Sequence, residues 1–122
     1  MNTTTYKNFL RACQNNDFKT AERHFEHVKL HTNMLRIRNL LVEDKHLNVL
    51  KIFHQLGVNF NDFYISDNPL KIAIKKGWVE GIKFLLEIGA DINFPYDNGW
   101  TPLMLASSYG QTEVIDILLL TY

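Results

Sequence analysis

Apolar side chains recur along the chain at intervals of three and four residues, in short blocks that are interrupted by turns rich in glycine, asparagine and aspartate. This spacing is typical of amphipathic helices, whereas a strand would alternate with a period of two. The pattern predicts an all-α fold of paired helices with no sheet in the core. The expected pairs are residues 6–13 with 18–29, 35–43 with 47–56, 69–76 with 79–88, and 102–109 with 112–121.

The chain also repeats itself. Pro69 and Pro102 are 33 positions apart, and the same offset relates Ala73 to Ala106, Gly77 to Gly110, Ile82 to Ile115, and Leu85-Leu86 to Leu118-Leu119. A second match joins the segment Gly57–Asn61 to Gly89–Asn93 at an offset of 32 positions. A fixed period of this length indicates a protein built from stacked structural repeats.

Each repeat has a physical interpretation. Proline suits the first turn of a helix, where a missing N–H costs nothing, and Asn68 and Thr101 directly precede the two prolines as N-caps. Gly77 and Gly110 are expected to end the first helices and to turn the chain. The inward positions are Leu70, Ala73, Ile74, Ile82, Leu85 and Leu86, and then Leu103, Ala106, Ser107, Val114, Ile115, Leu118 and Leu119. The segment 91–99 is expected to project as a loop with a tight turn at Asn98-Gly99.

This unit resembles the ankyrin repeat, whose pattern Gly-x-Thr-Pro-Leu-His-x-Ala is matched by residues 99–106 and whose Gly-Ala-Asp-x-Asn is matched by residues 89–93. Met104 and Lys71 stand where the family usually has histidine. The resemblance implies a solenoid of about four stacked helix-turn-helix repeats, roughly 4–32, 33–62, 63–95 and 96–122, forming a single domain over residues 1–122. The first two repeats lack the Thr-Pro-Leu motif, and the first is similar to an N-terminal cap.

Composition narrows the possible functions. The 122 residues include thirteen basic and thirteen acidic side chains, so no net charge attracts nucleic acid or an acidic membrane. A single cysteine cannot form an internal disulfide, the N-terminal residues lack an apolar signal segment, and the longest apolar stretch, Ile117–Leu120, is too short to span a bilayer. We therefore expect a cytoplasmic protein that contacts neither nucleic acid nor membrane.

No set of residues predicts catalysis. His24, His27 and His31 have helical spacing that could hold zinc, but no further ligand accompanies them, so a solvated helix face is the better interpretation. His46 and His54 are expected at the surface or between repeats. Cys13 matches the positions of Ile74 and Ser107 and is expected to be buried and unreactive. The sequence therefore predicts a protein that is not an enzyme and that needs no metal or cofactor.

The resemblance implies instead that the chain binds a partner protein through a concave face built from loop tips and first helices. On this chain that face comprises Tyr64, Ile65, Asp67, Lys75, Lys76, Asp97, Asn98, Trp100, Ser108 and Tyr109. Trp100 is the first candidate for a binding hot spot, and the alternative is that it packs its own loop onto a neighbouring repeat. Lys71, Lys75 and Lys76 form a basic stripe that is either merely solvated or a contact for an acidic partner.

Two roles remain open for such a protein. The first is a small stand-alone ankyrin protein of a microbe, acting as an immunity protein that inhibits a cognate toxin or as a host-directed effector. The second is the N-terminal ankyrin segment of a longer protein, serving as a structural or targeting module. Ile117 and Leu120 are apolar beyond the needs of the last repeat, which predicts a homodimer or partner contact through the C-terminal helix.

Overall fold

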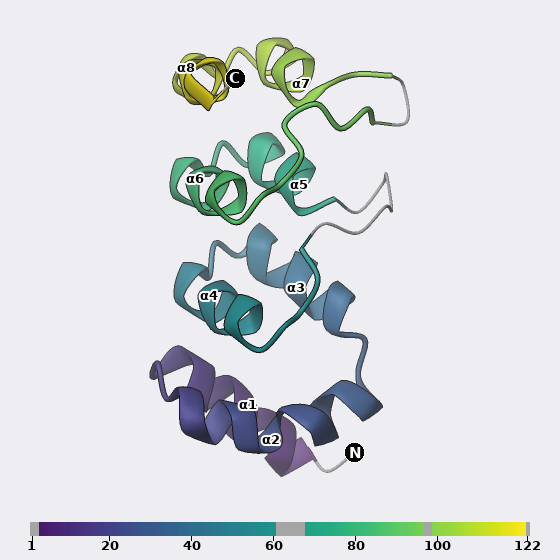
Figure 1. The fold of residues 1–122 in the computed structure, drawn as a ribbon, viewed down its shortest axis with the longest axis vertical. Coiled ribbons are helices and arrows are strands. Elements are labelled where there is room, and N and C mark those ends of the chain that lie inside the picture. Colours follow the sequence, from purple (N-terminus) through teal and green to yellow (C-terminus); the bar gives the residue numbers. More distant parts are fainter. Residues whose placement is uncertain (1–2, 61–67, 97–98, 122) are drawn as a thin grey trace. The chain divides into compact units, whose positions relative to one another are not determined.

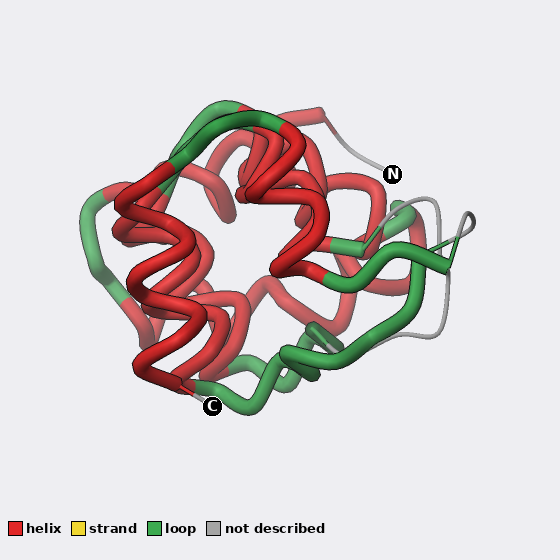
Figure 2. Tube along the Cα trace, turned by 90° about the horizontal axis from the view of Figure 1, so that it is seen from above, coloured by secondary structure: helices red, strands yellow, loops and turns green. Residues whose placement is uncertain are grey.

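The structure is a computed structural model that describes residues 3–60, 68–96 and 99–121. Within these ranges it contains eight α-helices and no strand (Figures 1 and 2). The helices are α1 (Thr3–Gln14), α2 (Phe18–His31), α3 (Met34–Glu43), α4 (Leu47–Gln55), α5 (Pro69–Lys75), α6 (Val79–Glu87), α7 (Pro102–Ser108) and α8 (Thr112–Thr121). The predicted all-α fold is confirmed, and every predicted helix end lies within three residues of the observed one.

Side chains cap the helices where the sequence suggests it. Asn68 Oδ1 accepts a hydrogen bond from the backbone N–H of Leu70 at 2.9 Å, and Thr101 Oγ1 accepts one from Met104 N–H at 3.3 Å. A proline follows each of these two caps, as predicted. The Thr101 hydroxyl bonds to a backbone N–H and not to a side chain. The cap therefore forms in the last repeat although Met104 stands where the family usually has histidine.

The turn between the two helices of a pair has the same geometry four times in the described part of the chain. Its central residue has a positive φ in each case: Asn16 (58°), Lys45 (59°), Gly77 (62°) and Gly110 (65°). The next residue then donates its N–H to a carbonyl five positions earlier, in the pairs Asp17 to Ala12, His46 to Leu41, Trp78 to Ala73, and Gln111 to Ala106. The two pairs without the Thr-Pro-Leu motif therefore share the local fold of the two that have it.

The chain divides into two compact units, and the first spans Met1–Asn59. Here α1 packs against α2 and α4, and α3 packs against α4 (Figure 1). The ring of Phe9 is the centre of the core, with its centroid 6.3 Å from that of Phe25 and 5.8 Å from that of Phe53. Cys13 is buried beside this cluster on α1, as predicted.

A buried arginine also belongs to the first unit. Arg38 on α3 is fully buried, and its Nη1 donates to the carbonyl oxygen of Asn59 at 2.6 Å. Its Nε and Nη2 both donate to Asn39 Oδ1, at 3.0 and 2.7 Å. These bonds use all three guanidinium nitrogen atoms and tie α3 to the segment that follows α4.

The second unit spans Phe60–Tyr122, in which α5 packs against α6 and α7, and α8 packs against α6 and α7. Its core contains most of the inward positions expected from the repeat: Leu70, Ala73, Ile74, Ile82, Leu85, Ala106, Val114 and Leu118. The rings of Phe60 and Phe84 add an edge-to-face contact at 5.9 Å. The prediction of one domain with repeats at 4–32, 33–62, 63–95 and 96–122 stays a prediction.

Two of the expected core positions are wrong. Ser107 is exposed, and its hydroxyl donates to Leu103 O of its own helix at 2.8 Å. Leu119 is 54% exposed, although Leu86, its counterpart one repeat earlier, is partly buried. Matching positions of successive repeats lie on the same face of their helices. On α5 this face is covered by α7, whereas no described helix covers the corresponding face of α7.

Candidate functional site

The loop between α6 and α7 is held in a tight turn that positions two aromatic side chains. Tyr96 N–H donates to Trp100 O at 2.8 Å, and Gly99 N–H donates to Tyr96 O at 2.7 Å. Gly99 has a φ of +77°, in the left-handed region that glycine enters without strain. The turn predicted around Gly99 is therefore confirmed, while its other member, Asn98, lies outside the described residues.

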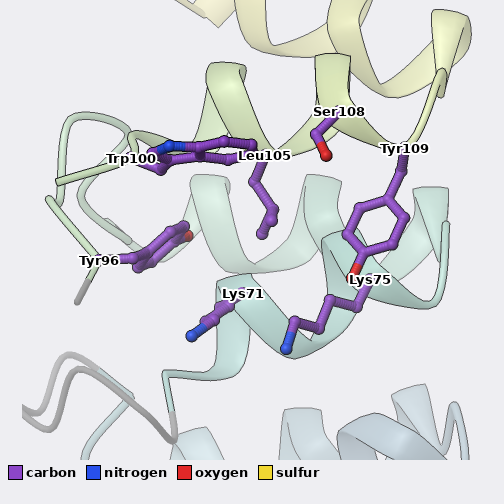
Figure 3. A pocket seen from close by; sticks show the side chains of 7 residues that line it. All are labelled: Lys71, Lys75, Tyr96, Trp100, Leu105, Ser108 and Tyr109. Carbon is purple, nitrogen blue, oxygen red and sulfur yellow. The ribbon is translucent and has the colours of Figure 1, made fainter. Parts of the chain in front are cut away.

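These two aromatic residues form one wall of a pocket of about 420 Å³. Figure 3 shows Tyr96 and Trp100 on one side, Tyr109 on the opposite side, and Leu105 between them. Two lysine side chains of α5 run in the same direction beneath the aromatic residues (Figure 3). We call this the aromatic–lysine pocket; its lining residues are Lys71, Lys75, Tyr96, Trp100, Leu105, Ser108 and Tyr109.

The aromatic residues of the pocket differ in their exposure. Tyr96 is buried, with only 3% of its surface exposed, whereas Trp100 is 37% exposed and Tyr109 is 50% exposed. Burial, and secondarily the carboxylate of Asp91, raises the pKa of Tyr96, so this phenol stays protonated. Trp100 and Tyr109 thus offer accessible ring surface with polar N–H and O–H groups, which is the combination that protein interfaces favour.

The charge of the pocket is positive. Lys71 Nζ lies 5.5 Å from the centroid of the Tyr96 ring, a cation–π distance, and Lys75 is exposed to solvent. No aspartate or glutamate is among the described residues that line the pocket. The site therefore joins two ammonium groups to aromatic walls, with the hydroxyl of Ser108 as a further donor and acceptor.

The structure brings four of the predicted binding residues together. Lys75, Trp100, Ser108 and Tyr109 all line the aromatic–lysine pocket. Lys76 is exposed at the C-terminal end of α5 and does not line it. The other predicted residues lie outside the described part of the chain: Tyr64, Ile65, Asp67, Asp97 and Asn98.

Three lining residues were not among the predicted binding residues. Lys71 had been recognised only as part of a basic stripe, and its position one turn before Lys75 was the available signal. No feature of the sequence marked Tyr96 or Leu105 as a lining residue. Tyr96 reaches the pocket through the fold of its loop, and Leu105 through the rotation of its helix. Trp100 also borders a more open hollow with Leu103, Met104, Ser107 and Ser108.

The histidines and Cys13 are the other candidate residues that the sequence offered. His27 and His31 are exposed and their ring centroids are 4.5 Å apart, while His31 Nδ1 lies 2.9 Å from His27 O, a backbone contact. No group of three metal-ligating side chains occurs in the part of the chain that was described. Burial raises the pKa of the Cys13 thiol to about 12, so the thiolate needed for nucleophilic chemistry is scarce near neutral pH.

Two apolar side chains of α8, Leu119 and Leu120, are exposed, whereas Ile117 and Leu120 were the expected pair. Leu120 is 88% exposed, and Ile117 is partly buried. Within the described residues, no helix is both long enough and apolar enough to cross a bilayer.

A family model for ankyrin repeats, in three copies, matches residues 9–122 of the chain. Similar segments occur in proteins of varied origin. In mouse, the "Protein phosphatase 1 regulatory subunit 12A" is 40% identical over an alignment of 66 positions that covers 48% of this chain and 6% of that protein. In Arabidopsis thaliana, the "E3 ubiquitin-protein ligase XBAT33" is 46% identical over 61 positions, covering 50% of this chain and 12% of the ligase.

A viral protein adds a third comparison. The "Putative ankyrin repeat protein L271" of Acanthamoeba polyphaga mimivirus is 33% identical over 75 positions, covering 61% of this chain and 10% of the viral protein. The similarity to all three thus spans a small fraction of much longer proteins. The family model covers nearly the whole chain, and its helical pairs recur in the structure with one turn geometry. The chain therefore belongs to the ankyrin-repeat family.

Proposed function

We propose that this protein acts by binding a partner protein, not by catalysis, and that the aromatic–lysine pocket is the centre of the contact. Ankyrin repeats are in general protein–protein interaction modules, which is the starting point of the proposal. The observation that carries it is the pair of accessible aromatic side chains, Trp100 and Tyr109, on opposite sides of a pocket that is also lined by two lysines. Binding energy at interfaces is concentrated in such residues.

The binding unit can serve in either of two settings. The relatives carry their matched segments inside much longer proteins, which favours a role as the binding module of a larger assembly or chain. A stand-alone microbial inhibitor of a toxin, or a host-directed effector, stays a prediction. All of these roles require the same elementary act, which is the recognition of one target protein through an exposed face.

The proposal is tested by affinity capture followed by calorimetry with the captured protein. We expect Trp100→Ala or Tyr109→Ala to weaken binding by about 2 kcal/mol, because each removes an aromatic hot spot. Leu30→Ala is the control, since Leu30 is an exposed apolar side chain on α2 that lines neither the pocket nor the hollow beside Trp100. Binding that survives both aromatic substitutions, in variants with wild-type circular dichroism, would exclude the pocket as the contact centre.

A further inference from the structure

We infer that two copies of this chain associate through the faces of α7 and α8 that no described helix covers. We call this surface the apolar end face; it comprises Leu103, Met104, Ser107, Ile115 and Leu119. The inference goes beyond the proposed function, since the second copy is a further partner on a different surface. It is carried by a comparison of the last two helix pairs, by the charge of the face and by its shape.

The same face exists one repeat earlier, where the structure shows what covers it. There α7 packs against α5, and α8 packs against α6. Ile74 and Ile82 belong to this face of the earlier pair and are fully buried. Their counterparts 33 positions later are Ser107, which is exposed, and Ile115, which is only partly buried. Because a helix pair covers the earlier face, a helix pair is the shape that fits the later one.

The residues of the apolar end face carry no charge. The sequence of α7 is PLMLASS, whereas α5, its counterpart, is PLKIAIK and contains two lysines. The acids of α8 are Glu113 and Asp116, and they match Glu80 and Lys83, which stay exposed in the repeat that is covered. Both acids therefore fall outside the stacked contact. In a two-fold contact a surface meets its own copy, so a charged surface would repel itself, whereas this one would not.

The apolar end face combines a hollow with an exposed leucine. The hollow has a volume of about 590 Å³ and is lined by Trp100, Leu103, Met104, Ser107 and Ser108. Leu119, on the neighbouring helix α8, is 54% exposed. A two-fold axis parallel to the helices would place α8 of each copy over α7 of the other, with Leu119 against the hollow. The face is thus complementary to itself in shape as well as in charge.

Sedimentation equilibrium over a range of protein concentrations measures the association. Wild type should change from monomer to dimer as the concentration rises. Leu119→Glu should raise the dissociation constant about 100-fold, because one buried unpaired charge costs about tenfold or more and a two-fold contact contains the substitution twice. Ser107→Glu should act in the same direction. Both positions are exposed, so both variants should keep the circular dichroism of wild type.

Leu40→Glu is the matched control. Leu40 lies on α3 and is 50% exposed, close to the 54% of Leu119, so the same side chain is exchanged at similar exposure with the same change of charge. This variant should leave the dissociation constant unchanged. Neither leucine lines the aromatic–lysine pocket, so binding of a partner protein at that pocket should survive both substitutions.

Paramagnetic relaxation enhancement tests the two-fold arrangement. A spin label attached to a Ser107→Cys variant reacts at an exposed position, whereas the native Cys13 is buried. When this variant is mixed with isotope-labelled wild type, the label should broaden amide signals of α7 and α8 in the other copy. Broadening confined to α1–α4 would show a head-to-tail contact and would overturn the two-fold association.

Other results would also overturn the inference. They are a monomer at the highest concentration that an NMR sample reaches, a dimer that Leu119→Glu leaves intact, and a dimer that Leu40→Glu disrupts equally. A monomeric wild type whose binding of a captured protein is lost with Leu119→Glu would place that protein on the face in the position of the second copy. The proposed function is judged separately, because it stands or falls with Tyr109→Ala, at a residue outside the apolar end face.

Discussion

Replacing Lys45 by glycine should stabilise the protein, although it removes a side chain and inserts glycine beside a helix. Lys45 has a φ of +59°, and its position corresponds to Gly77 and Gly110 in the later repeats. A left-handed conformation costs a residue with a Cβ about 1–2 kcal/mol, and glycine avoids that cost. Glycine also loses more conformational entropy on folding, about 0.5–1 kcal/mol. The difference predicts a net gain of about 0.5–1 kcal/mol.

Urea denaturation followed by circular dichroism measures this gain as a higher midpoint at unchanged slope. Asn16→Gly should gain less, because asparagine tolerates the left-handed region better than lysine. Gly110→Ala is the reverse experiment: a Cβ added there meets nothing within 4 Å, so the expected loss of about 0.5–1 kcal/mol is conformational. If Lys45→Gly lowers stability while Gly110→Ala leaves it unchanged, the common turn geometry of the four helix pairs is wrong.

Three further predictions concern packing and surface. Gly81→Ala should destabilise the protein by about 1–2 kcal/mol despite better helix propensity, because the new Cβ would overlap with the Trp78 ring at Cε3; the loss should vanish in a Trp78→Leu background, measured as a double-mutant cycle. Arg38→Met should cost about 2 kcal/mol in urea denaturation, since it leaves the buried bond to Asn59 O unmade, and a neutral result would contradict that role. Leu120→Lys should lower the mass seen by light scattering or the partner affinity, and no change in either would exclude contact through α8.

The fold could be predicted because its signals are local. Proline after a cap residue and glycine after a short apolar block mark helix ends wherever they recur, which is why α5 to α8 were located to within a residue. The earlier turns use Asn16 and Lys45 in place of glycine, so only the surrounding helical pattern identified them.

Burial was harder to predict because it depends on what covers a face. Ser107 and Leu119 occupy inward positions of the repeat, yet they are exposed because no described element packs over them. Arg38 is the opposite case, since a charged residue is expected at the surface. Its burial depends on the carbonyl of Asn59, 21 positions away, and no local pattern reveals such a partner.

The candidate site could be predicted only in part, because some of its residues are positioned by contacts that no local pattern reveals. Trp100, Ser108 and Tyr109 were assigned from the resemblance, which places loop tips and first helices on one face. Tyr96 could not be assigned, because it reaches the pocket only after its backbone N–H pairs with Trp100 O at 2.8 Å. This pairing depends on the turn at Gly99 and not on the repeat period.

The most direct test of the binding proposal is an NMR titration of the indole N–H signals with the captured partner protein. The chain has two tryptophans, and they form a matched pair: Trp100 lines the pocket, whereas Trp78 is buried at the start of α6 and does not line it. We expect the Trp100 indole signal and the amides of Ser108 and Tyr109 to shift on binding while the Trp78 indole signal stays in place. Saturated binding with an unmoved Trp100 signal, and with shifts confined to other regions, would contradict the pocket as the site of recognition.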